Sequence, residues 1–251
     1  LYSCLGAYVA AILAAKAGVK DVAILLPVTI LASALFGSLL GLLLSRYREI
    51  FFAMLSMALS MILYGVLVKS AWLGSTDGFN LPAPSYFGFS PRAAARGDWS
   101  YVCVGIVVVL TAYAVARYLA TSAGAMLDAV AQNEIRLEYL GASPRKVVFT
   151  VYVAAAVISG IGGALTALST RHIDPELANW TTSGGFVFVA LLAGRGSVIA
   201  PVIGYFLLEL VKTYALDWAP NAWQLILGAV MLFVILALPN GVWSLFARRS
   251  Q

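Results

Sequence analysis

Long apolar runs separated by short polar turns form the dominant pattern along this 251-residue chain. A helix needs about 20 apolar residues to cross the roughly 30 Å hydrocarbon layer of a membrane. The charge-free runs that reach or approach this length are residues 22–45, 50–68, 147–170 and 222–247. Shorter apolar runs cover residues 1–15, 101–116, 186–193 and 198–208. The pattern predicts an all-α, polytopic helical membrane protein, with some membrane segments broken by glycine and proline.

The composition agrees with this class. Hydrophobic residues make up 62% of the chain and charged residues only 11%, against about 25% charged residues in a soluble domain. The mean hydropathy is +0.92. In a membrane protein, a net charge of +5 is explained by basic residues that set the orientation of the chain in the membrane and contact lipid headgroups. We therefore expect no nucleic-acid partner. Cys4 and Cys103 lie in apolar runs and are expected to be packed thiols rather than a disulfide.

We expect one transmembrane domain over residues 1–251. The chain starts with Leu1 inside an apolar run and not with methionine, so we expect further helices to precede it. Residues 69–100 contain Pro82, Pro84 and Pro91 and are too broken for a spanning helix. They are predicted to form an ordered loop outside the membrane.

A polar interruption at residues 128–146 has a helical pattern of its own. Its apolar positions recur at steps of four, as on one face of a short helix; they are Leu127, Ala131, Ile135 and Tyr139. Asp128 would lie in the first turn, where a negative charge meets the positive end of the helix dipole. The alternative is an ordinary cytoplasmic loop that happens to be helical.

The end of this interruption carries the residues of a helix stop followed by a helix start. Gly141 can adopt the left-handed conformation that ends a helix. Ser143 fits the N-cap of a new helix, with Pro144 at its first position. The chain is therefore predicted to turn back into the membrane at this point.

Two rows of small residues at helical spacing predict close helix packing. One row consists of Ser33, Gly37, Gly41 and Ser45, and the other of Ala156, Gly160 and Ala164. A ligand-binding role for these glycines is the less favoured interpretation.

A second polar stretch precedes two short apolar runs, residues 186–193 and 198–208. It consists of Thr181, Thr182, Ser183, Gly184 and Gly185. Non-helical backbone at membrane depth must face protein or water, so we expect this break to border a translocation route. A kinked helix pair is the equally weighted alternative.

The sequence offers no catalytic or metal-binding constellation. His172 is the single histidine and lies in a polar turn, residues 171–176, where a solvated side chain is the expected state. No phosphate-binding glycine loop followed by lysine occurs, so the chain is not expected to hydrolyse ATP. Charged residues are almost absent from the spans, which argues against a proton relay.

The central interruption, with the sequence Asn133-Glu134-Ile135-Arg136 and then Glu138-Tyr139-Leu140-Gly141, resembles the LivM-type membrane subunits of bacterial ABC importers for branched-chain amino acids. Weaker matches support this resemblance at residues 6–8, 76–78, 194–197 and 238–241. The chain departs from the family pattern at Ala200, where glycine is common, and in lacking the helices that precede residues 6–8 in the family.

The resemblance implies a permease subunit that forms half of a translocation pathway in the bacterial inner membrane. In such families the central interruption is the coupling helix that docks on the ATPase. This role would fall on Leu127, Ala131, Asn133, Glu134, Ile135, Arg136, Glu138, Tyr139 and Gly141. The implied partners are a second related permease subunit, two ATP-binding subunits and a substrate-binding protein. ATP and magnesium would bind those partners, and this chain itself would carry no cofactor.

Two alternative functions share the same apolar spans. One is an ABC permease for urea or short-chain amides, and the other is an ATP-independent channel. Orientation follows if residues 128–146 are cytoplasmic, because one span then places residues 69–100 on the opposite face. Nine of the sixteen basic residues lie inside in that arrangement, a slight bias in the expected direction.

Overall fold

The computed structural model describes the chain except for residues 87, 89–95, 195–196, 221, 238–240 and 245–251. The chain divides into two compact units, residues 1–180 and residues 181–251. Each unit has its own packed interior and is described separately.

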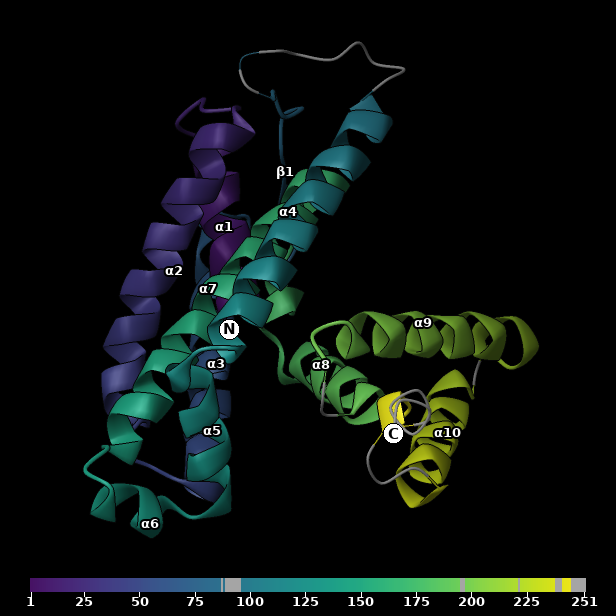
Figure 1. Ribbon diagram of the computed structural model, residues 1–251. Coiled ribbons are helices and arrows are strands. Elements are labelled where there is room, and N and C mark those ends of the chain that lie inside the picture. The colour runs from purple at the N-terminus through teal and green to yellow at the C-terminus, as the bar shows by residue number, and fades with distance from the viewer. Residues whose placement is uncertain (87, 89–95, 195–196, 221, 238–240, 245–251) are drawn as a thin grey trace. The chain divides into compact units, whose positions relative to one another are not determined.

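Unit 1 is built mainly from helices, with two short strands (Figure 1). Its α-helices are α1 (Tyr2–Ala15), α2 (Val22–Leu44), α3 (Glu49–Lys69), α4 (Arg96–Leu119), α5 (Ser122–Gln132), α6 (Glu134–Tyr139) and α7 (Pro144–Thr170). Its short elements are the 3-10 helices η1 (Ala71–Leu73) and η3 (Pro175–Ala178) and the strands β1 (Phe79–Asn80) and β2 (His172–Ile173). The first residue of α8 (Trp180–Ala193) ends this unit.

Among the described residues of unit 1, four helices are long and apolar enough to cross a membrane; they cover Val22–Leu44, Ile50–Lys69, Gly97–Leu119 and Pro144–Thr170. On α2, Leu31, Leu35 and Leu39 are 64–69% exposed. Such side chains are compatible with a lipid environment and not with water. The all-α, polytopic class is therefore confirmed.

The core of unit 1 is the contact among α1, α2 and α7, which lie side by side (Figure 1). Gly37 of α2 meets Ala156 of α7, where an added Cβ would lie 2.8 Å from the alanine Cβ. An added Cβ at Gly160 would overlap the side chain of Ser33, and one at Gly6 would overlap the Gly160 backbone. The two rows of small residues do pack helices closely, as predicted.

The connections at the two ends of unit 1 are joined across long sequence distances. At one end, Arg48 follows α2 and forms an ion pair with Glu134 of α6. At the other end, the Lys16 ammonium group lies 3.5 Å from the Trp72 ring centroid. The residue-128–146 interruption and residues 69–86 thus lie at opposite ends of the unit, while the compartment that each end faces stays a prediction.

Beyond α7 the chain folds back into unit 1. Arg171 ends the helix in the left-handed conformation, with φ 55°. β2 then pairs antiparallel with β1, and η3 packs against α1 and α3. The sequence predicted only a polar turn at residues 171–176, so this inward course was missed.

Unit 2 contains most of α8, together with α9 (Ala200–Trp218) and α10 (Trp223–Ala237). Gly204 of α9 lies against α8, where an added Cβ would be 2.8 Å from the Ala193 Cβ. Pro201 occupies the first turn of α9, a position that proline tolerates well, so it starts a helix instead of interrupting one. Glu209 and Lys212, three residues apart on α9, form an ion pair at 3.6 Å.

Candidate functional site

The central interruption folds as two helices and not as one. Asn133 separates α5 from α6 in an extended conformation, with φ −164° and ψ 105°. Its side chain accepts a hydrogen bond from the Arg136 N–H at 3.0 Å and so caps α6. An asparagine side chain often forms such a local hydrogen bond to the backbone, which competes with continuation of the helix and favours a helix start. The predicted single helix is therefore wrong in this respect.

This break divides the predicted apolar stripe. Leu127 and Ala131 belong to α5, whereas Ile135 and Tyr139 belong to α6. α5 starts at Ser122, so Asp128 lies in its second half and not in its first turn. The interaction of Asp128 with the positive helix end is a second part of the prediction that the structure corrects.

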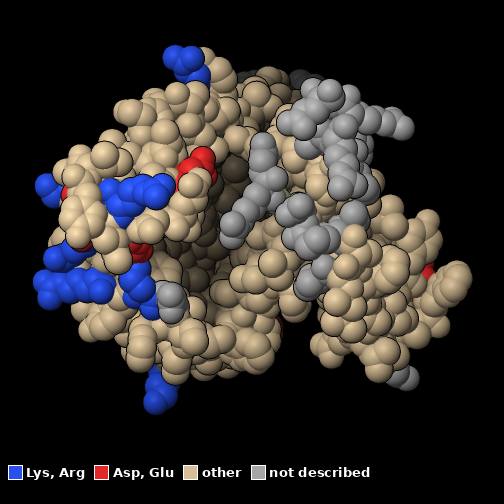
Figure 2. Space-filling model, turned by 60° about the horizontal axis from the view of Figure 1, so that its bottom comes forward, with Lys and Arg blue, Asp and Glu red and all other residues tan. Residues whose placement is uncertain are grey.

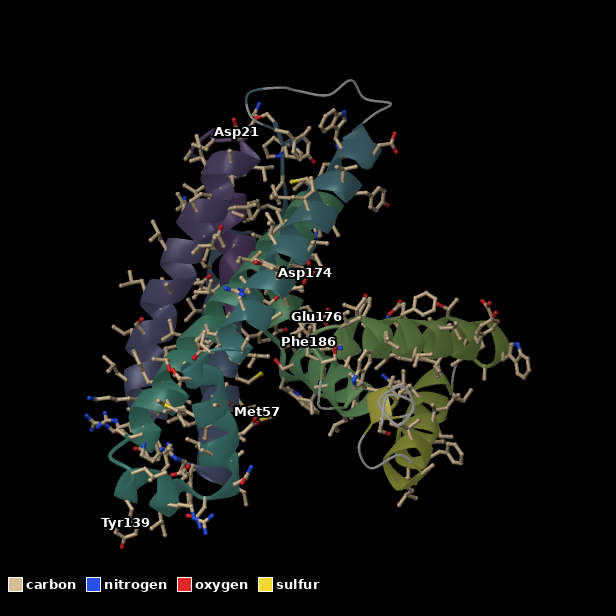
Figure 3. The ribbon with its side chains drawn as sticks, viewed as in Figure 1. Asp21, Met57, Tyr139, Asp174, Glu176 and Phe186 are labelled. Atoms are coloured by element: carbon tan, nitrogen blue, oxygen red, sulfur yellow. The ribbon has the colours of Figure 1, made fainter. Side chains whose placement is uncertain are left out.

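α6 presents an apolar surface at the end of unit 1. Ile135 is 65% exposed, Tyr139 is 88% exposed and the following Leu140 is 78% exposed. We call these three residues the docking surface, after the role that the resemblance implies for α6. Tyr139 lies at the extremity of the unit opposite Asp21 (Figure 3). Leu137, which the stripe did not include, is only 5% exposed and anchors α6 to the unit.

The chain reverses after α6 as the sequence predicted. Gly141 has φ 84°, and its N–H donates to the Glu138 carbonyl at 2.9 Å. A residue with a Cβ is strained at such a positive φ. Ser143 occupies the N-cap of α7, and Pro144 follows in its first turn. The turn thus links α6 directly to the longest helix of the unit.

An ion pair holds α6 to the turn between α2 and α3. The Arg48 Nε lies 2.8 Å from Glu134 Oε1 and 3.1 Å from Oε2. The Arg48 Nη1 also donates to the Ser45 carbonyl at 2.7 Å and to the Tyr47 carbonyl at 3.1 Å. The two residues are 86 positions apart, so no sequence spacing indicated this contact. The remaining charged candidates on α6, Arg136 and Glu138, are exposed.

Basic side chains gather over this end of unit 1 (Figure 2). Arg46, Arg136, Arg145 and Lys146 are among the exposed basic residues of these segments. Acidic residues of the same segments, Asp128 and Glu138, are exposed as well. The docking surface is therefore an apolar patch bordered by charges of both signs.

The second candidate stretch, Thr181 to Gly185, is helical. It forms the first turns of α8, so the predicted non-helical break is wrong. Thr181 is exposed, and the other four residues are partly exposed. An added Cβ at Gly184 or Gly185 would meet no atom within 4 Å. These glycines are thus not explained by packing among the described residues, and their place beside a translocation route stays a prediction.

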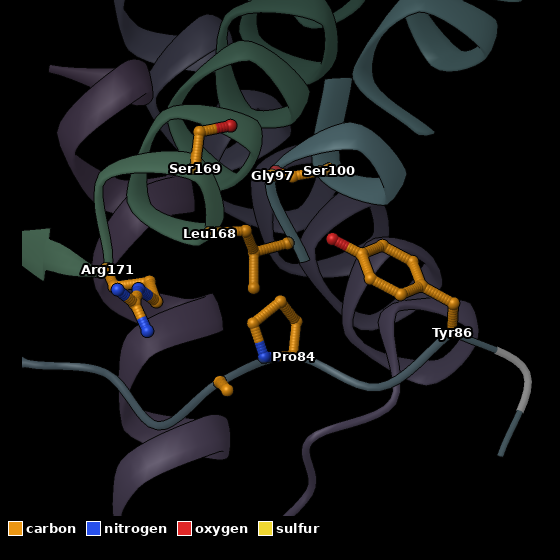
Figure 4. A pocket seen from close by; sticks show the side chains of 8 residues that line it. Pro84, Tyr86, Gly97, Ser100, Leu168, Ser169 and Arg171 are labelled. Atoms are coloured by element: carbon orange, nitrogen blue, oxygen red, sulfur yellow. The ribbon is translucent and has the colours of Figure 1, made fainter. Parts of the chain in front are cut away.

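Unit 1 also contains a cavity of about 320 Å³ between the chain near Pro84, the start of α4 and the end of α7 (Figure 4). Tyr86, Ser100, Ser169 and Arg171 contribute polar groups to its wall. Sequence reasoning missed this cavity because its walls come from three distant segments.

The described part of the chain holds no group of three or more metal-binding side chains. His172 is exposed as predicted, and its Nδ1 lies 2.9 Å from Asn80 Oδ1. Cys4 and Cys103 are free thiols.

The fold and the exposed α6 define a class: an all-helical, multi-pass membrane protein with a short helix turned away from its spans. The chain belongs to the family described as branched-chain amino acid transport system / permease component, whose model matches residues 2–235. This family and the apolar helices identify a protein of the bacterial inner membrane, and the resemblance seen in the sequence is confirmed.

Two curated relatives match in alignments of 239 positions that cover 86% of this chain and 56% of each relative. Both are called high-affinity branched-chain amino acid transport system permease protein LivM. The protein from Escherichia coli is 26% identical and that from Salmonella typhimurium is 25% identical. The chain thus spans about half the length of the curated relatives it matches. No solved structure matches it significantly.

Proposed function

We propose that this chain forms part of the membrane-spanning half of an ABC importer for branched-chain or other hydrophobic amino acids. The family and the printed names of the two relatives support this function. The proposed partners are a second, related permease subunit, two ATP-binding subunits and a substrate-binding protein. ATP and magnesium bind the ATPase partners, and this chain needs no cofactor of its own.

The observation that carries the proposal is the docking surface on α6. Ile135, Tyr139 and Leu140 expose large apolar side chains at the end of unit 1, beyond the membrane spans. Water disfavours such a patch, and a protein partner would cover it. A six-residue helix is unstable by itself, so α6 depends on its anchors and on docking for its order.

The anchors make α6 suitable for transmitting motion. Leu137 is buried beneath it, Asn133 caps its start, and Glu134 pairs with Arg48. Gly141 then connects α6 to α7 through a tight turn. A displacement of α6 by an ATPase therefore reaches a spanning helix through only a few residues. Thr181 to Gly185 are proposed to border the route that this motion opens.

The experiment uses the whole transporter, with Ile135→Asp compared with Gln132→Asp. Ile135→Asp places an unpaired charge in the docked interface, at a cost of several kcal/mol if that site is fully buried. Gln132→Asp adds the same charge at an exposed position on α5, outside the docking surface. Both variants leave the membrane spans unchanged and should insert normally.

Ile135→Asp should lose copurification of the ATPase and substrate-stimulated ATP hydrolysis, and Gln132→Asp should keep both. Wild-type stimulation in Ile135→Asp would show that α6 does not dock. Absence of any ATPase from the purified wild-type complex would favour an ATP-independent channel. Uptake of urea or amides in place of leucine would favour the alternative substrate class.

A further inference from the structure

The segment after α7, residues 172–179, descends toward the middle of unit 1; we call it the re-entrant segment. The Ser60 hydroxyl of α3 donates a hydrogen bond to the Ala178 carbonyl at 2.7 Å. Ser60 lies midway along the apolar span Ile50–Lys69, roughly 15 Å from either end at 1.5 Å per residue. The backbone of Ala178 therefore lies near the middle of the membrane span.

The re-entrant segment is packed firmly. Ile173 is 1% exposed and Ala178 is fully buried. Gly78 comes so close to Ile173 that an added Cβ would overlap its carbonyl. Because β2 and η3 together cover only six residues, the segment is short, irregular backbone within the membrane unit. Such backbone is tolerated where it is buried in protein or lines an aqueous cavity.

The segment carries two carboxylates. Asp174 is partly buried, and its Oδ1 accepts a hydrogen bond from the Glu176 N–H at 2.9 Å. Glu176 is exposed on unit 1. Both residues lie between the level of Asp21 and that of Tyr139 (Figure 3). An ionised carboxylate at this depth cannot face lipid without a large cost, so it faces water or protein.

Tyr8 of α1 supplies an independent observation at the same place. Tyr8 is only 4% exposed, and its hydroxyl has no hydrogen-bond partner among the described residues. Its ring packs edge-on against Phe79 of β1, the strand paired with β2. Phe79 pairs with Ile173, the residue before Asp174, so Tyr8 lies beside the re-entrant segment. A buried hydroxyl without a partner normally indicates a missing polar ligand or water.

We propose that the re-entrant segment lines the translocation route and that Asp174, Glu176 and Tyr8 form a transient binding site for the ammonium group of an amino acid. The inference rests on the proposed function. Two carboxylates and a hydroxyl match the three N–H donors of an ammonium group. The substrate side chain would then lie against apolar neighbours. Urea and simple amides carry no such cation and gain much less from this site.

Uptake by the complete transporter in proteoliposomes tests the site through Glu176→Gln, Asp174→Asn and Tyr8→Phe. Asparagine retains a side-chain oxygen that can cap η3, and phenylalanine retains the ring packing of Tyr8. Leucine uptake should fall about tenfold or more in the two carboxylate variants, which lose charge-assisted hydrogen bonds, and by less in Tyr8→Phe. Glu176→Asp should restore most of the uptake. Asp77→Asn is the control, because Asp77 is an exposed carboxylate of the loop before β1.

Copurification of the ATPase and basal ATP hydrolysis should be normal in all these variants. Wild-type leucine uptake by both carboxylate variants would overturn the inference. A wild-type complex that assembles with no ATPase or takes up no amino acid would instead overturn the proposed function.

Water access provides a second measurement that does not depend on transport rate. Glu176→Cys should react with a small charged thiol reagent, and leucine should slow that reaction. Leu35→Cys serves as the matched control, because Leu35 is exposed on the apolar face of α2 and should face lipid. Equal and slow reaction at both positions would show that Glu176 does not face an aqueous route.

Discussion

The Arg48–Glu134 ion pair yields the sharpest prediction for coupling. Glu134→Gln keeps the shape of the side chain and removes its charge. The Arg48 and Glu134 side chains are 33% and 39% exposed, so solvent screens their attraction. Pairs of this kind contribute about 0.2–1 kcal/mol. We place this pair near the upper value, because two backbone carbonyls already hold the Arg48 guanidinium in position.

A loss of about 1 kcal/mol corresponds to a roughly fivefold change in an equilibrium constant. The affected equilibrium is between α6 held in its docking position and α6 displaced from it. The apparent affinity for the ATPase should therefore weaken by up to about fivefold, because only the held state is ready to bind. Substrate uptake at limiting ATPase concentration should fall in proportion.

A double-mutant cycle measures this effect by ATPase binding to the detergent-solubilised permease. The cycle uses Arg48→Gln, Glu134→Gln and the double variant. A coupling free energy of roughly 0.5–1 kcal/mol is expected, and it should shrink at high salt. Arg46→Gln is the matched control, because Arg46 lies in the same turn and makes no ion pair among the described residues. Strictly additive effects of the two single changes would refute this explanation of how α6 is held.

Two further predictions concern packing and orientation. Gly160→Ala should destabilise the protein by about 1–3 kcal/mol through overpacking, because the added Cβ overlaps Ser33, and the loss should appear as a lower midpoint of thermal unfolding. Gly162→Ala, on the same helix, meets no atom within 4 Å and should leave the midpoint unchanged. Equal losses of stability in both variants would contradict the described packing. For orientation, Cys4 and Cys103 are first replaced by alanine. An impermeant thiol reagent added outside intact cells should then label Ser75→Cys but not Gln132→Cys. Labelling of Gln132→Cys would contradict the predicted cytoplasmic location of residues 128–146.

The spans and their packing could be predicted because their signals are local. A charge-free run of 20 residues has few alternatives to a membrane helix, and α2, α3 and α7 follow the predicted runs closely. Glycine and serine at steps of four predicted which face of α2 approaches α7. The reversal at Gly141 was equally local, because the turn depends on one residue with positive φ.

The errors arose where local signals compete or where distant residues decide. A step-of-four stripe continued across Asn133, but the capping bond of that side chain outweighed the pattern. The polar residues from Thr181 to Gly185 form a helix despite two glycines, since a helix satisfies its backbone groups internally. The Ser60–Ala178 bond joins residues 118 positions apart, and no sequence spacing indicates such a contact.

The glycine contact in the middle of α7 has a mechanical consequence. α7 contains 27 residues and is about 40 Å long, with the turn at Gly141 at one end and the re-entrant segment at the other. Gly160 sits against α1 and α2 without a side chain to separate them, so this crossing can act as a fulcrum. A rotation of about 10° there would move the Pro144 end by about 4 Å and the Thr170 end by between about 2 and 3 Å, in opposite directions. If an ATPase displaces α6 by a few ångströms, as proposed, the backbone beside Asp174 should move as well.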